Sequence, residues 1–225
     1  MRRRRGTTGC GLRFVRMPCV WGAILAGLAP REAEVHGLVA LMEIQASRSR
    51  ARVGPSGEPI LLNDQNRAHW DQLLIRRGLA ALERAEGLGS ALGPYTLQAA
   101  IAACHARART PAETDWARIV TFYEALSQVM PSPVVGLNRA VAVAMTVGPA
   151  AGLELVDGLA SEPALRNYHL LPSVRGDFLF KLGRFDEARG EFERAAGLAR
   201  NGRERELLLD RVRACAHGSA PAQAQ

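Results

Sequence analysis

The sequence is poor in the residues that build β-sheets. Only 5% of its 225 residues are aromatic, and runs of β-branched residues bounded by turn signals are scarce. The hydrophobic fraction of 48% consists mainly of Ala, Leu and Val, a composition that favours helices. The sequence therefore predicts an all-α fold. At this length a chain buries roughly 70% of its unfolded surface, enough for one sizeable domain or a short solenoid.

Residue spacings typical of metal sites and catalytic motifs are also missing. The four cysteines include no CxxC pair, and the five histidines lack the spacing of metal ligands, so we predict reduced thiols, no metal and no cofactor. Cys104 lies in an apolar run and is expected in the core. There is no GxSxG, HExxH, P-loop or GxGxxG motif, so we predict that the chain is not an enzyme.

No apolar run approaches the roughly 20 residues of a membrane span. MRRRR followed by the apolar stretch Cys19–Ala29 imitates a secretory signal, but this stretch is short, lacks an A-x-A cleavage site and is followed by Pro30. We therefore expect a cytoplasmic protein with no membrane partner. Residues 1–22 stay unassigned and are interpreted as disordered or as the non-native start of a truncated reading frame.

Positive charge is concentrated at the amino terminus. The net charge is +7, and Lys181 is the single lysine among 29 basic residues. Residues 1–30 hold six arginines and no acid, which leaves 23 basic and 22 acidic residues in the rest of the chain. A nearly neutral body gives no electrostatic footprint for phosphates, so we expect no direct specific DNA binding beyond weak contacts of the tail.

Helical periodicity and breakers divide the chain into successive helices. Two helices are expected between residues 23 and 52, broken near Pro30, followed by a loop over residues 53–59. Asp64 is a candidate N-cap for a first turn over residues 65–67 that leads into the helix over residues 68–87. Thr114–Asp115 is expected to cap the helix over residues 116–130. Further helices are expected over residues 95–108, 132–145, 150–160 and 204–216.

The segment from Leu171 to Asn201 has the spacing of a tetratricopeptide-type helical hairpin. Its small and aromatic residues are predicted on a first helix (Gly176, Leu179), at a turn (Gly183, Phe185) and on a second helix (Ala188, Phe192, Ala195). Gly148 precedes Gly183 by 35 residues, close to the period of about 34. We predict a tetratricopeptide-like helical-hairpin solenoid over residues 23–216 and a disordered tail over residues 217–225.

Two groups of polar residues are candidates for interaction or for structural ties. Asn138 and Arg139 interrupt a helix that looks buried on all sides, so we expect Arg139 to be buried and paired with Asp115 or Glu124. The alternative places Arg139 in a groove that grips an acidic partner segment. The same choice applies to a second group: Tyr168, His169, Arg175 and Asp177. For Arg175 and Asp177, interhelix salt bridges are favoured over contact with a partner.

Seven runs of the chain form a recognisable series. In chain order they are EVHGLVALM, ILLNDQNRAHWD, GPYTLQAAIAACHA, TDWARIVTFYEAL, SPVVGLNRAVAVAM, GPAAGL and YHLLPSVRGDFL. These runs resemble the carboxyl-terminal half of one group of extracytoplasmic-function RNA polymerase sigma factors, a sigma-70 family group with a long tetratricopeptide-like extension. The resemblance covers residues 23–213.

This resemblance implies a role in transcription initiation, exerted through protein contacts with RNA polymerase or sigma-factor regions. The sigma-factor regions that read the −10 and −35 promoter elements have no counterpart, and the stretch before Glu32 is too short for them. We therefore expect a regulatory, protein-interaction domain. The alternative is an enzyme or a small-ligand-binding helical domain with a deep pocket lined by His105, Arg139 and Tyr168.

Overall fold

The computed structural model describes residue 22 and residues 24–55, 57–89 and 91–218, and these residues confirm the all-α prediction because they contain helices and no β-strand. They form two compact units, each described by itself. The first comprises residues 1–53 and 65–113, and the second residues 54–64 and 114–225, as far as these are described. Residues 1–21 and 219–225 of the predicted start and tail lie outside the described part.

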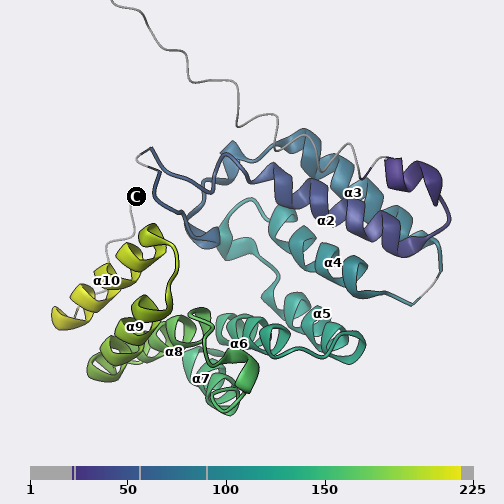
Figure 1. Ribbon diagram of the computed structural model, residues 1–225. Helices are drawn as coiled ribbons and strands as arrows, with labels where there is room; N and C mark the ends of the chain where they lie inside the picture. Colours follow the sequence, from purple (N-terminus) through teal and green to yellow (C-terminus); the bar gives the residue numbers. More distant parts are fainter. Residues whose placement is uncertain (1–21, 23, 56, 90, 219–225) are drawn as a thin grey trace, which may run out of the picture. The chain divides into compact units, whose positions relative to one another are not determined.

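Three helices pack together in the first unit: α2 (Ala33–Ser47), α3 (Gln72–Gly87) and α4 (Pro94–Arg107). The helix α2 contacts both others along its length (Figure 1). Glycines permit this closeness, since a Cβ atom on Gly37 would lie 2.7 Å from the backbone nitrogen of Thr96. Residues 24–28 are also helical, and the chain turns at Pro30, as predicted.

The predicted N-cap of α3 is wrong. This helix begins at Gln72, and the Oδ1 atom of Asp71 accepts hydrogen bonds from the backbone nitrogens of Leu73 (3.0 Å) and Leu74 (3.2 Å). Asp64 instead ends the 3₁₀ turn Leu62–Asp64. Asn and Asp side chains compete for backbone hydrogen bonds in turns, and the cluster of such residues before Asp71 explains why the α-helix starts late.

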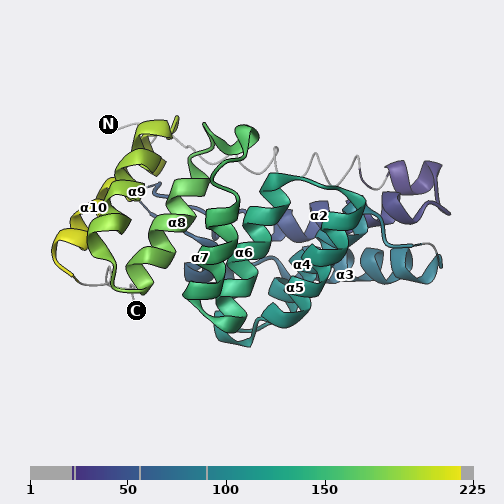
Figure 2. The same ribbon diagram turned by 90° about the horizontal axis from the view of Figure 1, so that it is seen from below.

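Six helices follow one another in the second unit, and each packs on the next (Figure 2), which confirms the predicted solenoid of helical hairpins. Gly148 and Gly183 connect consecutive helices with φ angles of +118° and +77°, a backbone region that favours glycine. The helices are α5 (Trp116–Val129), α6 (Pro133–Val147), α7 (Pro149–Gly158), α8 (Leu170–Lys181), α9 (Phe185–Leu198) and α10 (Gly202–Ala216).

The predicted tetratricopeptide spacing is realised in the hairpin of α8 and α9. A Cβ atom on Gly176 would lie 2.9 Å from the ring of Phe192, so only glycine lets the two helices approach this closely. Phe192 is buried together with Leu179, Ala188 and Ala195 in the core of the second unit. Phe185 is the first residue of α9 and not part of the turn.

The helix α6 corrects the expectation of burial on all sides. Its buried residues are Val135, Leu137, Ala140 and Ala142 alone, while Met145 and Val147 are exposed. The helix packs mainly between α5 and α7, so its remaining face reaches solvent although that face is apolar. In the described part of the chain, no helix is long and apolar enough to cross a membrane.

Candidate interaction site on the second unit

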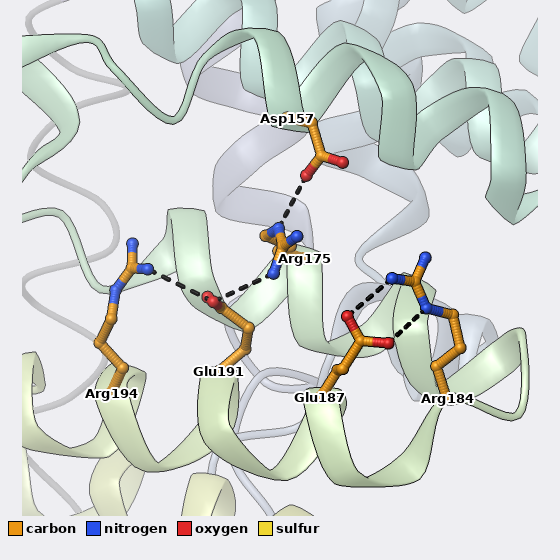
Figure 3. A network of polar contacts seen from close by, with 6 residues as sticks. All are labelled: Asp157, Arg175, Arg184, Glu187, Glu191 and Arg194. Carbon is orange, nitrogen blue, oxygen red and sulfur yellow. Dashed lines mark hydrogen bonds and ion pairs between the residues drawn. The ribbon is translucent and has the colours of Figure 1, made fainter.

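Arg175 connects three consecutive helices of the second unit. From α8 its Nε atom donates to Oδ1 of Asp157 on α7 at 2.7 Å, and its Nη1 atom donates to Oε1 of Glu191 on α9 at 3.1 Å (Figure 3). Partial burial opposes the charge of Arg175, but its bonds to the two carboxylates outweigh this effect and raise its pKa. The guanidinium therefore stays charged and holds α7, α8 and α9 together.

A recess with a volume of about 280 Å³ lies at this ion network. Apolar side chains line part of the recess, and the remaining lining residues are charged. Glu191 also accepts from Arg194 at 3.3 Å, and Arg194 is half exposed. The second carboxylate oxygen of Glu191, Oε2, is buried and accepts no hydrogen bond from the residues that the structure describes. The lining residues are Val156, Asp157, Ala160, Leu171, Arg175, Glu191 and Arg194.

This arrangement suits recognition by contact. The charges around the recess are balanced, so a partner gains from a matching pattern of donors and acceptors rather than from net charge. Arg194, which is half exposed, has donors left for a carbonyl or carboxylate of a partner. Beside the recess, Arg184 and Glu187 form a bidentate pair with both bonds at 2.7 Å, and Arg184 lowers the pKa of Glu187 (Figure 3).

Asp177 lies on the same helix as Arg175 and has different partners. It pairs with Lys181 at 2.7 Å one turn along α8 and with Arg211 on α10. The guanidinium of Arg211 also lies over the rings of Phe180 and Phe192, 5.5 and 5.3 Å from their centres. Asp177 thus ties α8 to α10, so both Arg175 and Asp177 make interhelix ion pairs.

Tyr168 and His169 precede α8 and make weaker contacts. Their rings lie 6.0 Å apart at a tilted angle, and Tyr168 packs against the core. The Nε2 atom of His169 lies 3.6 Å from a carboxylate oxygen of Glu204 on α10. Both side chains are only partly buried, and neither lines the recess at Arg175.

Arg139 is paired as expected but is not buried. Its Nη2 atom lies 3.1 Å from Oε1 of Glu124 on α5, and the two side chains are 36% and 54% exposed. Asp115 is not its partner, because its Oδ1 atom accepts from the backbone nitrogen of Arg118 and caps α5, as predicted. Asn138 is exposed. The expected buried charge is wrong because this face of α6 is solvated.

The pocket required by the alternative function does not coincide with a described recess. His105 is buried in the first unit, whereas Arg139 and Tyr168 belong to the second. None of the three lines the recess at Arg175 or a second recess in the first unit, which is lined by Arg50, Ala68, His69, Trp70 and Asp71. The same part of the chain holds no group of three or more His, Cys, Asp or Glu residues placed for a metal ion. Cys104 is buried, as predicted.

Sequence reasoning found Arg175 but missed most of the residues around it. Asp157, Glu191 and Arg194 lie on helices whose charged residues, judged from the sequence pattern, are expected to face solvent. The spacing of Glu191 and Arg194, three residues apart on α9, was the available signal, because such residues share a helix face. The link to Arg175 depends on how α8 and α9 cross, which the pattern of a single helix does not reveal.

Comparisons with known proteins give a partial match. Residues 20–86 match a family described as "Family of unknown function (DUF6596)". The chain is 46% identical over 181 residues to an uncharacterized protein of Rhizobium meliloti (strain 1021), an alignment that covers 80% of this chain and 42% of that protein. The chain thus spans less than half the length of this curated relative. No solved structure matches.

Proposed function

We propose that the chain is a regulatory domain of the sigma-factor type that acts in transcription initiation by protein–protein contact and not by catalysis. In this proposal it works in the cytoplasm on RNA polymerase or on the promoter-reading regions of a sigma factor. The recess on α7, α8 and α9 is its contact site.

The observation that carries the proposal is the stack of consecutive hairpins from α5 to α10 with a charged recess on three successive helices. Stacked hairpins bury their apolar faces against one another and leave extended surfaces for binding. The half-exposed Arg194 gives this surface hydrogen-bonding capacity that the chain itself does not use. The resemblance to the sigma-factor extension supports the assignment to transcription.

Binding in trans tests the proposal. The promoter-reading half of an extracytoplasmic-function sigma factor of the resembling group is immobilised, and binding of this chain is measured by biolayer interferometry alongside run-off transcription with core RNA polymerase. We expect binding in the micromolar range or tighter and a change in transcript yield of at least twofold. Absence of both effects, also with core polymerase as the immobilised partner, contradicts the proposal.

A matched pair of variants assigns the effect to the recess. Arg194→Gln removes one charged donor from the recess and is expected to weaken binding about tenfold, the effect of losing a charge-assisted hydrogen bond. Arg189→Gln is the control, because Arg189 lies on the same helix, is 52% exposed and pairs only loosely with Glu193 at 3.8 Å. Equal binding by both variants places the contact elsewhere.

A further inference from the structure

Two arginines converge on one neutral oxygen at the carboxyl-terminal end of α2. Arg48 donates through Nη2 to Oε1 of Gln45, and Arg52 donates to the same oxygen at 2.6 Å. Among the residues that the structure describes, neither arginine forms an ion pair with a carboxylate. A carboxylate is the usual partner where guanidinium groups lie this close together, so the positive charge here is not neutralised.

A third arginine, Arg67, lies with Arg48 over the ring of Trp70. The guanidinium carbons of Arg48 and Arg67 lie 5.7 and 5.3 Å from the centre of its ring, which is itself buried. Arg67 is fixed by Nη1, which donates to the carbonyl oxygens of His105 and Ala108 at 2.8 Å each, at the end of α4. Arg67 therefore adds positive charge beside Trp70 from a fixed position.

The electrostatics show that positive charge accumulates here. Burial, together with the charges of Arg52 and Arg67, lowers the pKa of Arg48 to about 10. Burial and the charges of Arg48 and Arg67 lower the pKa of His105 to about 4, so this histidine is neutral at pH 7. Burial also lowers the pKa of Arg67, and Glu113 acts in the opposite direction.

Two buried side-chain donors beside these arginines have no acceptor within the described part of the chain. They are Nε of Arg48 and Nε1 of Trp70. Trp70 also lines a recess of about 450 Å³, together with Arg50, Ala68, His69 and Asp71. The Oδ1 atom of Asp71 caps α3. The side chain of Arg50 is exposed. Buried donors rarely stay without an acceptor, so the site can bind an oxyanion that its own chain does not supply.

We propose that Arg48, Arg50, Arg52 and Trp70, here called the basic cluster, bind a phosphate monoester. A phosphate monoester carries nearly two negative charges and three acceptor oxygens at pH 7, whereas a carboxylate carries one charge. The guanidiniums of Arg48 and Arg67 lie over the ring of Trp70, and Arg50 lines the same recess as Trp70, so a dianion removes more of the mutual repulsion than a monoanion does. The planar fork of arginine also matches phosphate oxygens in pairs. This site lies on the first unit and is independent of the proposed function.

Calorimetric titration of the full chain with small anions of matched size tests the proposal. At pH 7.5 we expect methyl phosphate to bind saturably at millimolar concentration or below, and at least fivefold more tightly than the monoanions dimethyl phosphate and acetate. Equal affinity for all three anions, or no saturable binding of methyl phosphate below 5 mM, overturns it.

A variant of an exposed arginine tests whether methyl phosphate binds at the basic cluster. Arg52 is exposed, so Arg52→Gln is expected to fold normally, which circular dichroism checks, and to weaken binding of methyl phosphate about tenfold. Arg84→Gln is the control, because Arg84 is also exposed and lies about three turns along α3 from its start. Unchanged binding by Arg52→Gln, or equal loss in both variants, overturns the assignment.

The phosphate can come from a free small molecule or from a phosphorylated side chain, and two further probes separate these sources. Adenosine monophosphate represents the first source and a hexapeptide with one phosphoserine the second. Tighter binding of either probe than of methyl phosphate supports the site and identifies its source. If neither probe binds, the proposal fails.

Discussion

The two units differ in where their polar side chains lie: the first unit buries several of them, and the second unit places its ion pairs on partly exposed surfaces. The buried polar and charged side chains are His36, Glu43, Ser47, Gln65, Arg67, Thr96 and His105 in the first unit and Thr114 alone in the second, within the described residues. The second unit instead has an apolar core, and its ion pairs lie on partly exposed surfaces between helices. Apolar packing of a repeat thus specifies one unit, and buried polar contacts help to specify the other.

The partly buried Glu34 and the buried Glu43 show how polar contacts join the helices of the first unit. The carboxylate of Glu34 accepts from the backbone nitrogens of Tyr95 and Thr96 at 2.8 and 3.1 Å and so joins α2 to the start of α4. Glu43 is 1% exposed and pairs with Arg77 on α3 at 2.6 Å. Both carboxylates reach from α2 to a neighbouring helix, so they fix the position of α2 within the unit.

The largest effect is expected from the apolar core of the second unit. Phe192→Ala removes a fully buried ring that packs against Gly176, and the free energy of unfolding should fall by about 3–5 kcal/mol. Urea denaturation followed by circular dichroism measures the change. Phe192→Leu keeps most of the volume and should cost clearly less. If the free energy of unfolding of Phe192→Ala falls by less than about 1 kcal/mol, the tetratricopeptide spacing of Gly176 and Phe192 does not reflect packing.

In the first unit, the ion pair of Glu43 and Arg77 should contribute more to the free energy of unfolding than the half-exposed position of Arg77 suggests. Arg77→Met leaves the buried carboxylate without this donor, so stability should fall by about 2 kcal/mol, the worth of a hydrogen bond to a charged group. The neighbouring Arg76 is exposed, and Arg76→Met should stay within about 0.5 kcal/mol of the parent. If the two variants are equally stable in urea, buried polar contacts do not help to specify the first unit.

His105 should make the first unit sensitive to acid. Its folded pKa of about 4 lies below the ordinary value of 6.5, so the unfolded chain binds the proton first and stability falls as pH decreases from about 6.5 to about 4. Between pH 7.5 and pH 5 this group alone should cost about 2 kcal/mol. We expect His105→Gln to lose stability less steeply than the parent over this range. Parallel curves of unfolding free energy against pH would contradict the assigned pKa.

The smallest effect is expected at the exposed pair of the second unit. Arg139→Met breaks an ion pair whose two side chains are 36% and 54% exposed, so stability should change by less than about 1 kcal/mol. Glu124→Gln should have a similarly small effect in the same urea titration. A loss of several kcal/mol in either variant would indicate that this pair is screened from solvent.

The contrast between the units also explains what the sequence could predict. The spacing of Gly176, Ala188 and Phe192 predicted the hairpin of α8 and α9, because apolar packing repeats with the helix period. The cap at Asp64 was misplaced because several Asn and Asp residues compete there for the same role. Arg139 was expected to be buried because its neighbours are apolar, yet the exposure of a helix face depends on which helices cover it. Contacts such as that of Arg175 with Glu191 depend on tertiary geometry and have no pattern along a single helix.

Hydrogen–deuterium exchange of the chain, with and without the promoter-reading half of the sigma factor, tests the proposed contact most directly. We predict that binding slows exchange in peptides from α7, α8 and α9 around Asp157, Arg175 and Glu191, and that Arg194→Gln reduces this protection while Arg189→Gln preserves it. Binding without protection of these three helices, or with protection confined to the first unit, would contradict the account.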